Sequence, residues 1–225
     1  MLVARVRDEV TSILDNGHLP LVIGGDCPLL LGCLAAVTGR GRLGLLFVDG
    51  HEDAYLPGQS STGEVADMEL AFALGMADAS WSPELTALLP LVEPADVRIL
   101  GARDAGLLRA EGVPSLGDRL AIVDGDRLAA DPAGTAASAC ASLSDPWWFH
   151  LDLDVLSTEA LPAVDYPQPG GLAWEELVSV ATTALLADPH GWDITIYNPD
   201  LDPERVHARR IVRFVGSVIE QASGL

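Results

Sequence analysis

Short, strongly apolar runs alternate along this chain with longer stretches rich in alanine and leucine. The short runs are typical of buried strands, and the intervening stretches place apolar residues at helical spacing. Alternation of this kind builds a parallel sheet with helices on its faces. We therefore predict a three-layer α/β/α fold with a mostly parallel sheet, in a single domain that spans residues 1–225.

The predicted elements follow from these runs. Strands are expected at 19–23, 44–48, 97–100, 121–123, 148–153 and 192–197. Helices are expected at 3–14, 29–37, 65–74, 84–89, 105–111, 134–142, 174–186 and 208–223.

The charge of the chain excludes several classes of function. Thirteen basic residues, all arginine, face thirty-three acidic ones, which gives a formal net charge of -20. Without lysine there is no Schiff-base nucleophile, no pyridoxal-phosphate anchor and no Walker lysine. So negative a chain also repels nucleic acids and anionic lipid, so we expect neither as a partner.

Cysteine content and hydropathy bear on the compartment. Three scattered cysteines do not resemble the even framework of a secreted disulfide protein, so we expect a reducing, cytoplasmic location. The N-terminal segment lacks the apolar core of a signal peptide, and no apolar run approaches the roughly 18 residues of a spanning helix. We therefore expect no membrane association.

Residues with metal-binding side chains stand at the ends of three predicted strands. The carboxyl ends of parallel strands border the ligand crevice of an open sheet, so groups from separate strands can meet there. The candidate ligands are Cys27 after the first strand, Asp49, His51 and Asp53 after the second, and Asp152 and Asp154 at the end of the fifth.

The spacing of these residues suggests how they converge. In extended backbone, residues two apart point the same way, so we expect Asp49, His51 and Asp53 to face one point and Glu52 to face away. Asp49 with Asp152 can bridge two cations, and carboxylates with one imidazole suit Mn(II) best. Any one such string can instead be a solvated turn. Two acidic clusters after apolar strands favour bound cations, which remove the cost of burying unpaired carboxylates.

Four segments occur in a fixed order: Gly24-Gly25-Asp26-Cys27-Pro28, Asp49-Gly50-His51-Glu52-Asp53, Asp152-Leu153-Asp154 and Pro167-Gln168-Pro169-Gly170-Gly171-Leu172. Together they resemble the signature segments of the arginase and agmatinase ureohydrolases, from about residue 19 to residue 202. That family normally has Gly-Gly-Asp-His, Asp-Ala-His-x-Asp and Ser-x-Asp-x-Asp in the first three positions. Most of the ligand residues are therefore present here.

The resemblance implies an arginase-like fold with two divalent metal ions, of which manganese is the first expectation. It implies one metal ion on Cys27, Asp49, Asp53 and Asp152, and the other on Asp49, His51, Asp152 and Asp154. The implied reaction is hydrolysis of a C–N bond in a linear amidine by a hydroxide that bridges the metals. Asp53 would also hydrogen-bond that hydroxide, and urea is the usual co-product.

Cys27 is the first departure from the family pattern, because most relatives have histidine there. A thiolate makes the site softer and more negative, so it admits Zn, Fe or Ni more readily. Some hydroxyarginine-cleaving members also carry cysteine at this position. The alternative is that Cys27 is a small buried structural residue, but its place beside Gly-Gly-Asp at a strand end favours a ligand.

The substrate-handling residues also depart from the pattern. The family's guanidinium-binding acid corresponds to Ile196, and its proton-shuttle histidine to Ala66. Glu64 and Asp67 are the candidate catalytic replacements for that histidine, although each is equally compatible with a charge at a helix start. Asp200 is a further candidate carboxylate beside the last strand.

The family's contacts to an amino-acid end are altered as well. Arg109 falls where an acid would meet an α-amino group, which argues against L-arginine. Arg109 is instead a candidate to receive a substrate carboxylate, as in a formimino or guanidino acid. Arg103 is equally compatible with a substrate contact and with a structural ion pair.

Only 23 residues precede Gly24, fewer than in the family, so we expect either that the sheet lacks the family's first strand or that this sequence starts downstream of the true start. A missing strand exposes apolar surface, which supports the expectation of a homo-oligomer.

The function predicted is a metal-dependent hydrolase of a small amidine. A metal-binding protein without catalysis is the alternative, and a phosphoesterase is weaker because no cationic cluster is evident beside the site.

Overall fold

All six described strands belong to one parallel sheet, in a computed structural model that describes residues 2–77 and 82–224. Their order is β1-β6-β5-β2-β3-β4. The strands are β1 (Leu21–Ile23), β2 (Gly44–Val48), β3 (Val97–Gly101), β4 (Ala121–Asp124), β5 (Trp147–Asp152) and β6 (Trp192–Thr195). The predicted α/β fold with a parallel sheet is therefore confirmed.

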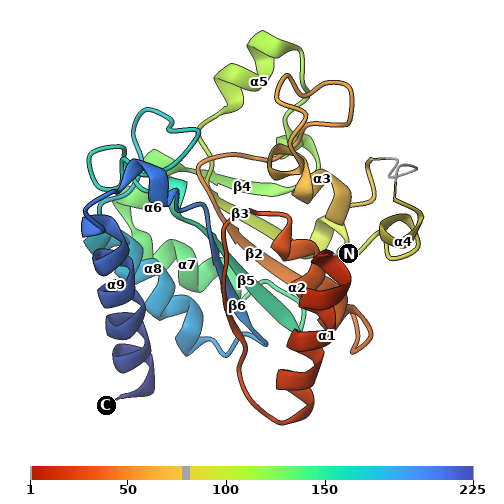
Figure 1. The fold of residues 1–225 in the computed structure, drawn as a ribbon, viewed down its shortest axis with the longest axis horizontal. Helices are drawn as coiled ribbons and strands as arrows, with labels where there is room; N and C mark the ends of the chain where they lie inside the picture. The colour runs from red at the N-terminus through yellow and green to blue at the C-terminus, as the bar shows by residue number, and fades with distance from the viewer. Residues whose placement is uncertain (1, 78–81, 225) are drawn as a thin grey trace.

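Helices cover both faces of this sheet (Figure 1). The α-helices are α1 (Leu2–Asp15), α2 (Leu29–Thr38), α3 (Glu69–Ala73), α4 (Pro83–Thr86), α5 (Ala105–Glu111), α6 (Gly125–Ala130), α7 (Pro132–Cys140), α8 (Trp174–Leu186) and α9 (Val206–Ser223). Helices α1, α2 and α3 pack on one face, and α7, α8 and α9 pack on the other. Among the described residues, no helix is long and apolar enough to span a bilayer.

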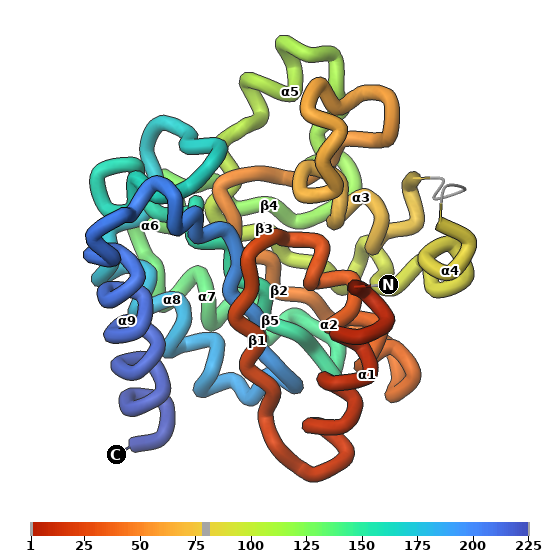
Figure 2. The backbone as a smooth tube through the Cα atoms, in the orientation of Figure 1, coloured from red at the N-terminus to blue at the C-terminus, as the bar shows by residue number. Residues whose placement is uncertain are grey.

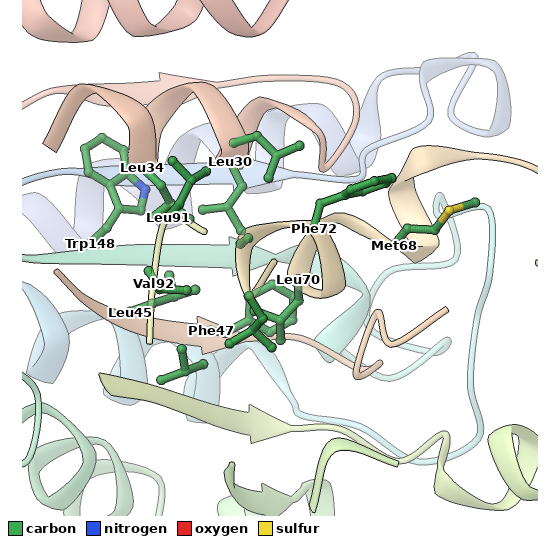
Figure 3. Packing of buried hydrophobic residues seen from close by; sticks show 14 of the residues in the cluster. Leu30, Leu34, Leu45, Phe47, Met68, Leu70, Phe72, Leu91, Val92 and Trp148 are labelled. Carbon is green, nitrogen blue, oxygen red and sulfur yellow. The ribbon is translucent and has the colours of Figure 1, made fainter. Parts of the chain in front are cut away.

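The central strand β2 is buried on both faces, as its unbroken apolar sequence predicts. Leu45 and Phe47 point into the core beneath α2 and α3, whereas Leu46 and Val48 point into the core beneath α7 and α8. Figure 3 shows the first of these cores, in which Leu30 of α2 lies among the side chains from the sheet. The alternation along one strand thus divides the interior into two apolar layers.

The predicted elements differ from the observed ones at three places. The expected helix at 65–74 is divided into a 3-10 turn, η1 (Val65–Asp67), and α3, with Met68 between them. The last strand ends at Thr195, because Ile196 has a left-handed backbone (φ 59°) and its N–H donates to the carbonyl of Gly25. Helix α6 was not predicted from the sequence.

The chain segments that follow β2 and β3 gather at the carboxyl end of the sheet. Figure 2 shows the segment after β2, in orange, beside α5, in green, above the strands. The hydroxyl of Tyr55 joins them by donating to Glu111 Oε2 at 2.6 Å. This end of the sheet is where the candidate ligands were expected.

Close packing of α1 on α2 depends on a glycine. A Cβ at Gly32 would lie 2.7 Å from Val6 Cβ and 2.8 Å from the carbonyl oxygen of Val3, so no larger residue fits without moving α1. Gly216, in α9, is also helical, but a Cβ there would meet no atom within 4 Å. Alanine substitution at these two helical glycines therefore tests two effects separately: overpacking at Gly32 and helix propensity at Gly216.

We predict opposite signs for alanine substitution at these positions. Gly32→Ala should destabilise the protein by ~1–3 kcal/mol, because overpacking outweighs the gain in helix propensity. Gly216→Ala should stabilise it by ~0.5–1 kcal/mol through propensity alone. Urea unfolding of the two variants beside the parent measures both values. Equal stabilisation by both would show that α1 does not pack on α2 as described.

Candidate metal centre

Three distant stretches of chain bring the predicted ligands to one place. Cys27 follows β1, Asp49 follows β2 and Asp152 ends β5. Strand β5 pairs with both β2 and β6, and β6 pairs with β1, so these ends lie along one edge. A cavity of about 200 Å³ opens there. All six predicted ligands line it: Cys27, Asp49, His51, Asp53, Asp152 and Asp154.

The side chains in this cavity are in direct contact. The Cys27 thiol donates to Asp152 Oδ2 at 2.8 Å. His51 Nδ1 lies 2.9 Å from Asp154 Oδ2 and 3.6 Å from Asp49 Oδ1. Each of Asp49, His51 and Asp154 has a donor atom within 4.8 Å of the other two. The convergence expected from the strand ends is therefore present.

The backbone that achieves this convergence is not the extended segment we predicted. Asp53 has a left-handed backbone with φ 43°, so the chain turns sharply between Asp49 and Asp53. Asp49 Oδ1 accepts the N–H of His51, and Asp152 Oδ1 accepts the N–H of Asp154, each at 2.7 Å. Such aspartate turns leave the second oxygen of each carboxylate available for other contacts. The residues converge through turns rather than through strand alternation.

Neighbouring residues hold these turns in place. Glu52 faces away from the cavity, as predicted, and accepts hydrogen bonds from Ser115 Oγ at 2.8 Å and the N–H of Leu116 at 2.5 Å. Arg103 Nη2 donates to the carbonyl oxygen of Asp154 at 2.7 Å, and its other nitrogens reach further backbone carbonyls. Arg103 is therefore a structural clamp and not a substrate contact.

Burial dominates the electrostatics of the cavity. It raises the pKa of Asp49, Asp53 and Asp152 well above the usual range, and neighbouring carboxylates add to the effect. At His51 burial opposes protonation, but Asp154 and Asp49 outweigh it and raise the pKa to about 12. Burial also favours protonation of Asp154, yet His51 outweighs it and lowers the pKa of Asp154. Without a cation, one ion pair forms and the remaining acids retain protons.

The donor set fits divalent cations. Asp49 Oδ2 is buried and has no hydrogen-bond partner among the described residues, and Asp49 offers a donor atom within 4.8 Å of those of His51, Asp53, Asp152 and Asp154. Carboxylate oxygens, an imidazole and a thiol are donors that Mn(II) and Zn(II) accept, and positive charge replaces the protons that the buried acids otherwise need. Groups around Asp49 could thus hold more than one ion.

Two further residues border the cluster. Glu69, at the start of α3, is fully buried and lies near Asp49 and Asp53. His150, in β5, is fully buried and lies near Asp49 and Asp152. The sequence signal for His150 is its position in a strand two residues before the ligand Asp152, because residues two apart in a strand point to the same side. For Glu69 the available signal was a lone acid in the apolar run Met-Glu-Leu-Ala-Phe.

The two candidate proton-transfer residues differ in position. Asp67 lines the cavity, and its Oδ2 accepts hydrogen bonds from Ser60 at 2.6 Å and Thr62 at 2.8 Å. Its Oδ1 is buried and has no hydrogen-bond partner among the described residues. Glu64 lies outside the cavity wall and accepts a hydrogen bond from the hydroxyl of Tyr166 at 2.8 Å. Geometry therefore favours Asp67 over Glu64.

The outer wall of the cavity corrects one prediction. Ile196 and Ala66 line it, as the family pattern implies for their positions. Arg109 does not, because Leu107 and Glu111, four residues apart on α5, face the cavity and Arg109 is exposed on the other side of the helix. The prediction that Arg109 receives a substrate carboxylate is therefore wrong for this cavity.

Comparison with known proteins gives the same family throughout. The family model described as the arginase family matches residues 1–220. An arginase from Brevibacillus brevis is 29% identical over 221 residues, which are 95% of this chain and 73% of that protein. A formimidoylglutamase from Aeromonas hydrophila is 27% identical over 229 residues, which are 96% of this chain and 67% of that protein.

Solved structures agree with the sequence comparisons. The crystal structure of arginase from Bacillus cereus has a TM-score of 0.80 and 29% identity, and the match covers 96% of this chain and 76% of that one. The fold, the positions of the candidate ligands and the match to the family model all indicate the same family. The chain belongs to the arginase family.

Proposed function

We propose that this protein is a metal-dependent hydrolase that cleaves a C–N bond of a linear amidine. The observation that carries the proposal is the convergence of six metal-binding side chains on one cavity, among them Asp49, whose buried Oδ2 has no hydrogen-bond partner among the described residues. The family's characterised members hydrolyse C–N bonds in linear amidines, which supports the same reaction class here.

The residues divide into an outer and an inner group. Asp49, His51 and Asp154 offer oxygen and nitrogen donors on the more accessible side, where the His51 side chain is 15% exposed. These donors suit Mn(II). Cys27 and Asp152 contact each other at the fully buried side. Two divalent ions bound here would lower the pKa of a water enough to supply hydroxide near neutral pH.

The chain itself supplies proton handling. Asp53 lies beside Asp49 in the cavity and is the candidate to orient the attacking water by accepting its hydrogen bond. Asp67 Oδ1, free of other partners and buried, is the candidate to carry a proton to the departing amine. The hydroxyls of Ser60 and Thr62 hold the opposite oxygen of Asp67 and so set the direction of the free one.

Charge in the cavity indicates the substrate class. Asp104 and Glu111 line the outer part with Asp67, and among the described lining residues the only basic one is His51. A substrate carboxylate would meet no cationic partner there, whereas a cationic group would meet several acids. We therefore propose a guanidino or amidino compound whose far end is neutral or positive.

The second candidate is a metal-binding protein without catalysis. Ile196 and Ala66 make the wall apolar at two positions where the family pattern has an acid and a histidine. In that case the centre would bind metal and release no product. The two candidates therefore differ in turnover and not in metal content.

We predict metal-dependent turnover that requires Asp152. Apo-protein loaded with Mn(II), Zn(II), Fe(II) or Ni(II) should release urea, formamide or ammonia from at least one guanidino, ureido or formimino compound. Asp152→Ala should abolish this release and lower metal content, because the residue links both groups of ligands. Asp118→Ala, which removes an exposed carboxylate outside the cavity, is the control. Stoichiometric metal without any product would favour the second candidate.

We predict that Asp67 matters more than Glu64 for turnover. Loss of a proton-transfer group costs ~10²–10⁴-fold in rate. Asp67→Asn should therefore lower kcat by about a hundredfold or more while KM changes little, because the amide preserves shape but cannot carry the proton. Steady-state kinetics of Asp67→Asn and Glu64→Gln rank the two residues. A larger loss in the Glu64 variant would assign the proton transfer to Glu64.

We predict a preference for cationic substrates. Agmatine and 4-guanidinobutanoate have similar length but end in an ammonium and a carboxylate respectively. The ratio of their kcat/KM values should exceed tenfold in favour of agmatine at low ionic strength and fall as salt is added, because the acids of the outer wall act through charge. Equal values, or preference for the acid, would contradict the proposed substrate class.

A further inference from the structure

Three fully buried side chains form a group that the family pattern does not contain. Cys27, Glu69 and His150 come from the loop after β1, the start of α3 and strand β5. Each offers a donor atom within 4.8 Å of the other two, and none is more than 2% exposed. Of the three, the family's ligand set includes only the position of Cys27.

The surroundings of His150 direct one ring nitrogen into this group. Nδ1 lies 2.6 Å from Asp193 Oδ2, and the other oxygen of Asp193 accepts a hydrogen bond from Trp148 Nε1 at 2.5 Å. The ring also stacks on Phe47, with centroids 4.7 Å apart. A proton on Nδ1 would be donated to the Asp193 carboxylate, and Nε2 would then present its lone pair to the group. A carboxylate behind a histidine is the usual arrangement for a metal ligand.

The ring nitrogen of His150 that faces this group has no hydrogen-bond partner among the described residues. His150 Nε2 is buried and has no hydrogen bond from the described residues, and Asp49 Oδ2, 3.9 Å away, is likewise unpartnered. Both carboxylate oxygens of Glu69 are buried, and the one described side chain that reaches them is the neighbouring Asp53 carboxyl, itself a buried acid. Buried polar atoms without partners are rare in proteins, and a site for a bound ion is one of the few explanations.

We propose that Cys27, Glu69 and His150 together hold a divalent cation of the zinc type on the inner side of the centre. One sulfur, one nitrogen and one oxygen donor are the ligands that Zn(II) takes in tetrahedral protein sites. When the ion binds, it replaces the thiol proton of Cys27, which passes to solvent, and the sulfur then coordinates as thiolate. The assignment rests on the proposed metal centre and not on the proposed reaction.

A different arrangement of the same residues gives the competing explanation. Glu69 also lies close to Asp53, and two buried acids can share one proton without any metal ion. In that case Glu69 would contribute nothing to metal affinity. The two explanations therefore differ in what removal of the Glu69 charge does to zinc binding.

Zinc affinity of matched variants tests the assignment. Competition titration against a chelator should show that Glu69→Gln binds Zn(II) about a hundredfold more weakly than the parent, because even indirect partners of a metal ligand contribute 10–100-fold. Glu176→Gln changes a glutamate that accepts the N–H of Ala173 at the start of α8, outside the cavity, and should leave zinc affinity unchanged. Unchanged affinity in the Glu69 variant would overturn the proposal.

The same variants separate the inner ion from the outer one. Mn(II) binding, measured by electron paramagnetic resonance, should be little affected by Glu69→Gln because Asp49, His51 and Asp154 remain. An equal loss of Mn(II) and Zn(II) would show that Glu69 does not belong to a zinc-selective set. The Zn(II) and Mn(II) binding measurements use no substrate. A protein that shows the expected binding but no turnover would therefore refute the proposed reaction and leave the proposed zinc site intact.

The parent protein provides a test that requires no variant. With one equivalent of Zn(II), X-ray absorption at the zinc edge should show sulfur and imidazole scattering from the same ion. The ligand set implied by the family, Cys27 with three aspartates, predicts sulfur without imidazole. Sulfur without imidazole, or imidazole without sulfur, would overturn the proposal.

A spectroscopic control identifies the sulfur. Co(II) bound in place of zinc should give a thiolate charge-transfer band that disappears in Cys27→Ser. Cys33→Ser, which changes a fully buried cysteine in α2, should retain the band. Persistence of the band in the Cys27 variant would exclude Cys27 as the ligand.

Discussion

Repulsion among buried carboxylates is the constraint on which the rest of this structure depends. Asp49, Asp53, Asp152 and Glu69 are buried around one small space, and burial with mutual repulsion raises the pKa of each. Among the described residues, His51 pairs with Asp154, and the guanidinium of Arg103 adds positive charge near the same carboxylate. A fold that gathers so many acids is stable without cations only if the acids keep their protons. Divalent ions satisfy the same groups without that requirement, so the geometry and the proposed chemistry share one cause.

The scaffold concentrates its rigidity around this cluster. A Cβ at Gly101 would lie 2.8 Å from the carbonyl oxygen of Asp49, so the end of β3 packs directly against the backbone that carries the central ligand. Arg103, two residues later, clamps the turn at Asp154 from the other side. On the buried side, Asp193 fixes the ring of His150. Asp49, Asp154 and His150 are thus each packed against or held by a residue that does not line the cavity.

The sequence predicted the strands and the convergence of six ligands because both follow from general rules. Apolar runs mark buried strands, and the carboxyl ends of parallel strands meet. Burial of Glu69 could not be foreseen, since it depends on how α3 packs over β2 after a break at Met68. The role assigned to Arg109 could have been avoided: helical spacing places Leu107 and Glu111 on one face of α5 and Arg109 on the opposite side.

Loss of the family's polar residues at Ile196 and Ala66 changes where charge acts on a substrate. Both positions remain in the cavity wall, so their apolar side chains line it without contributing a proton or a countercharge. The acids that remain are Asp67, one residue from Ala66, and Asp104 and Glu111 nearer the mouth. An incoming cation would therefore meet acidic groups along the outer wall before it reached the ligands. Under the proposed function, recognition would therefore act on the far end of the substrate more than on the reacting carbon, and the inner cavity would be left to metal ions and the groups that could hold them.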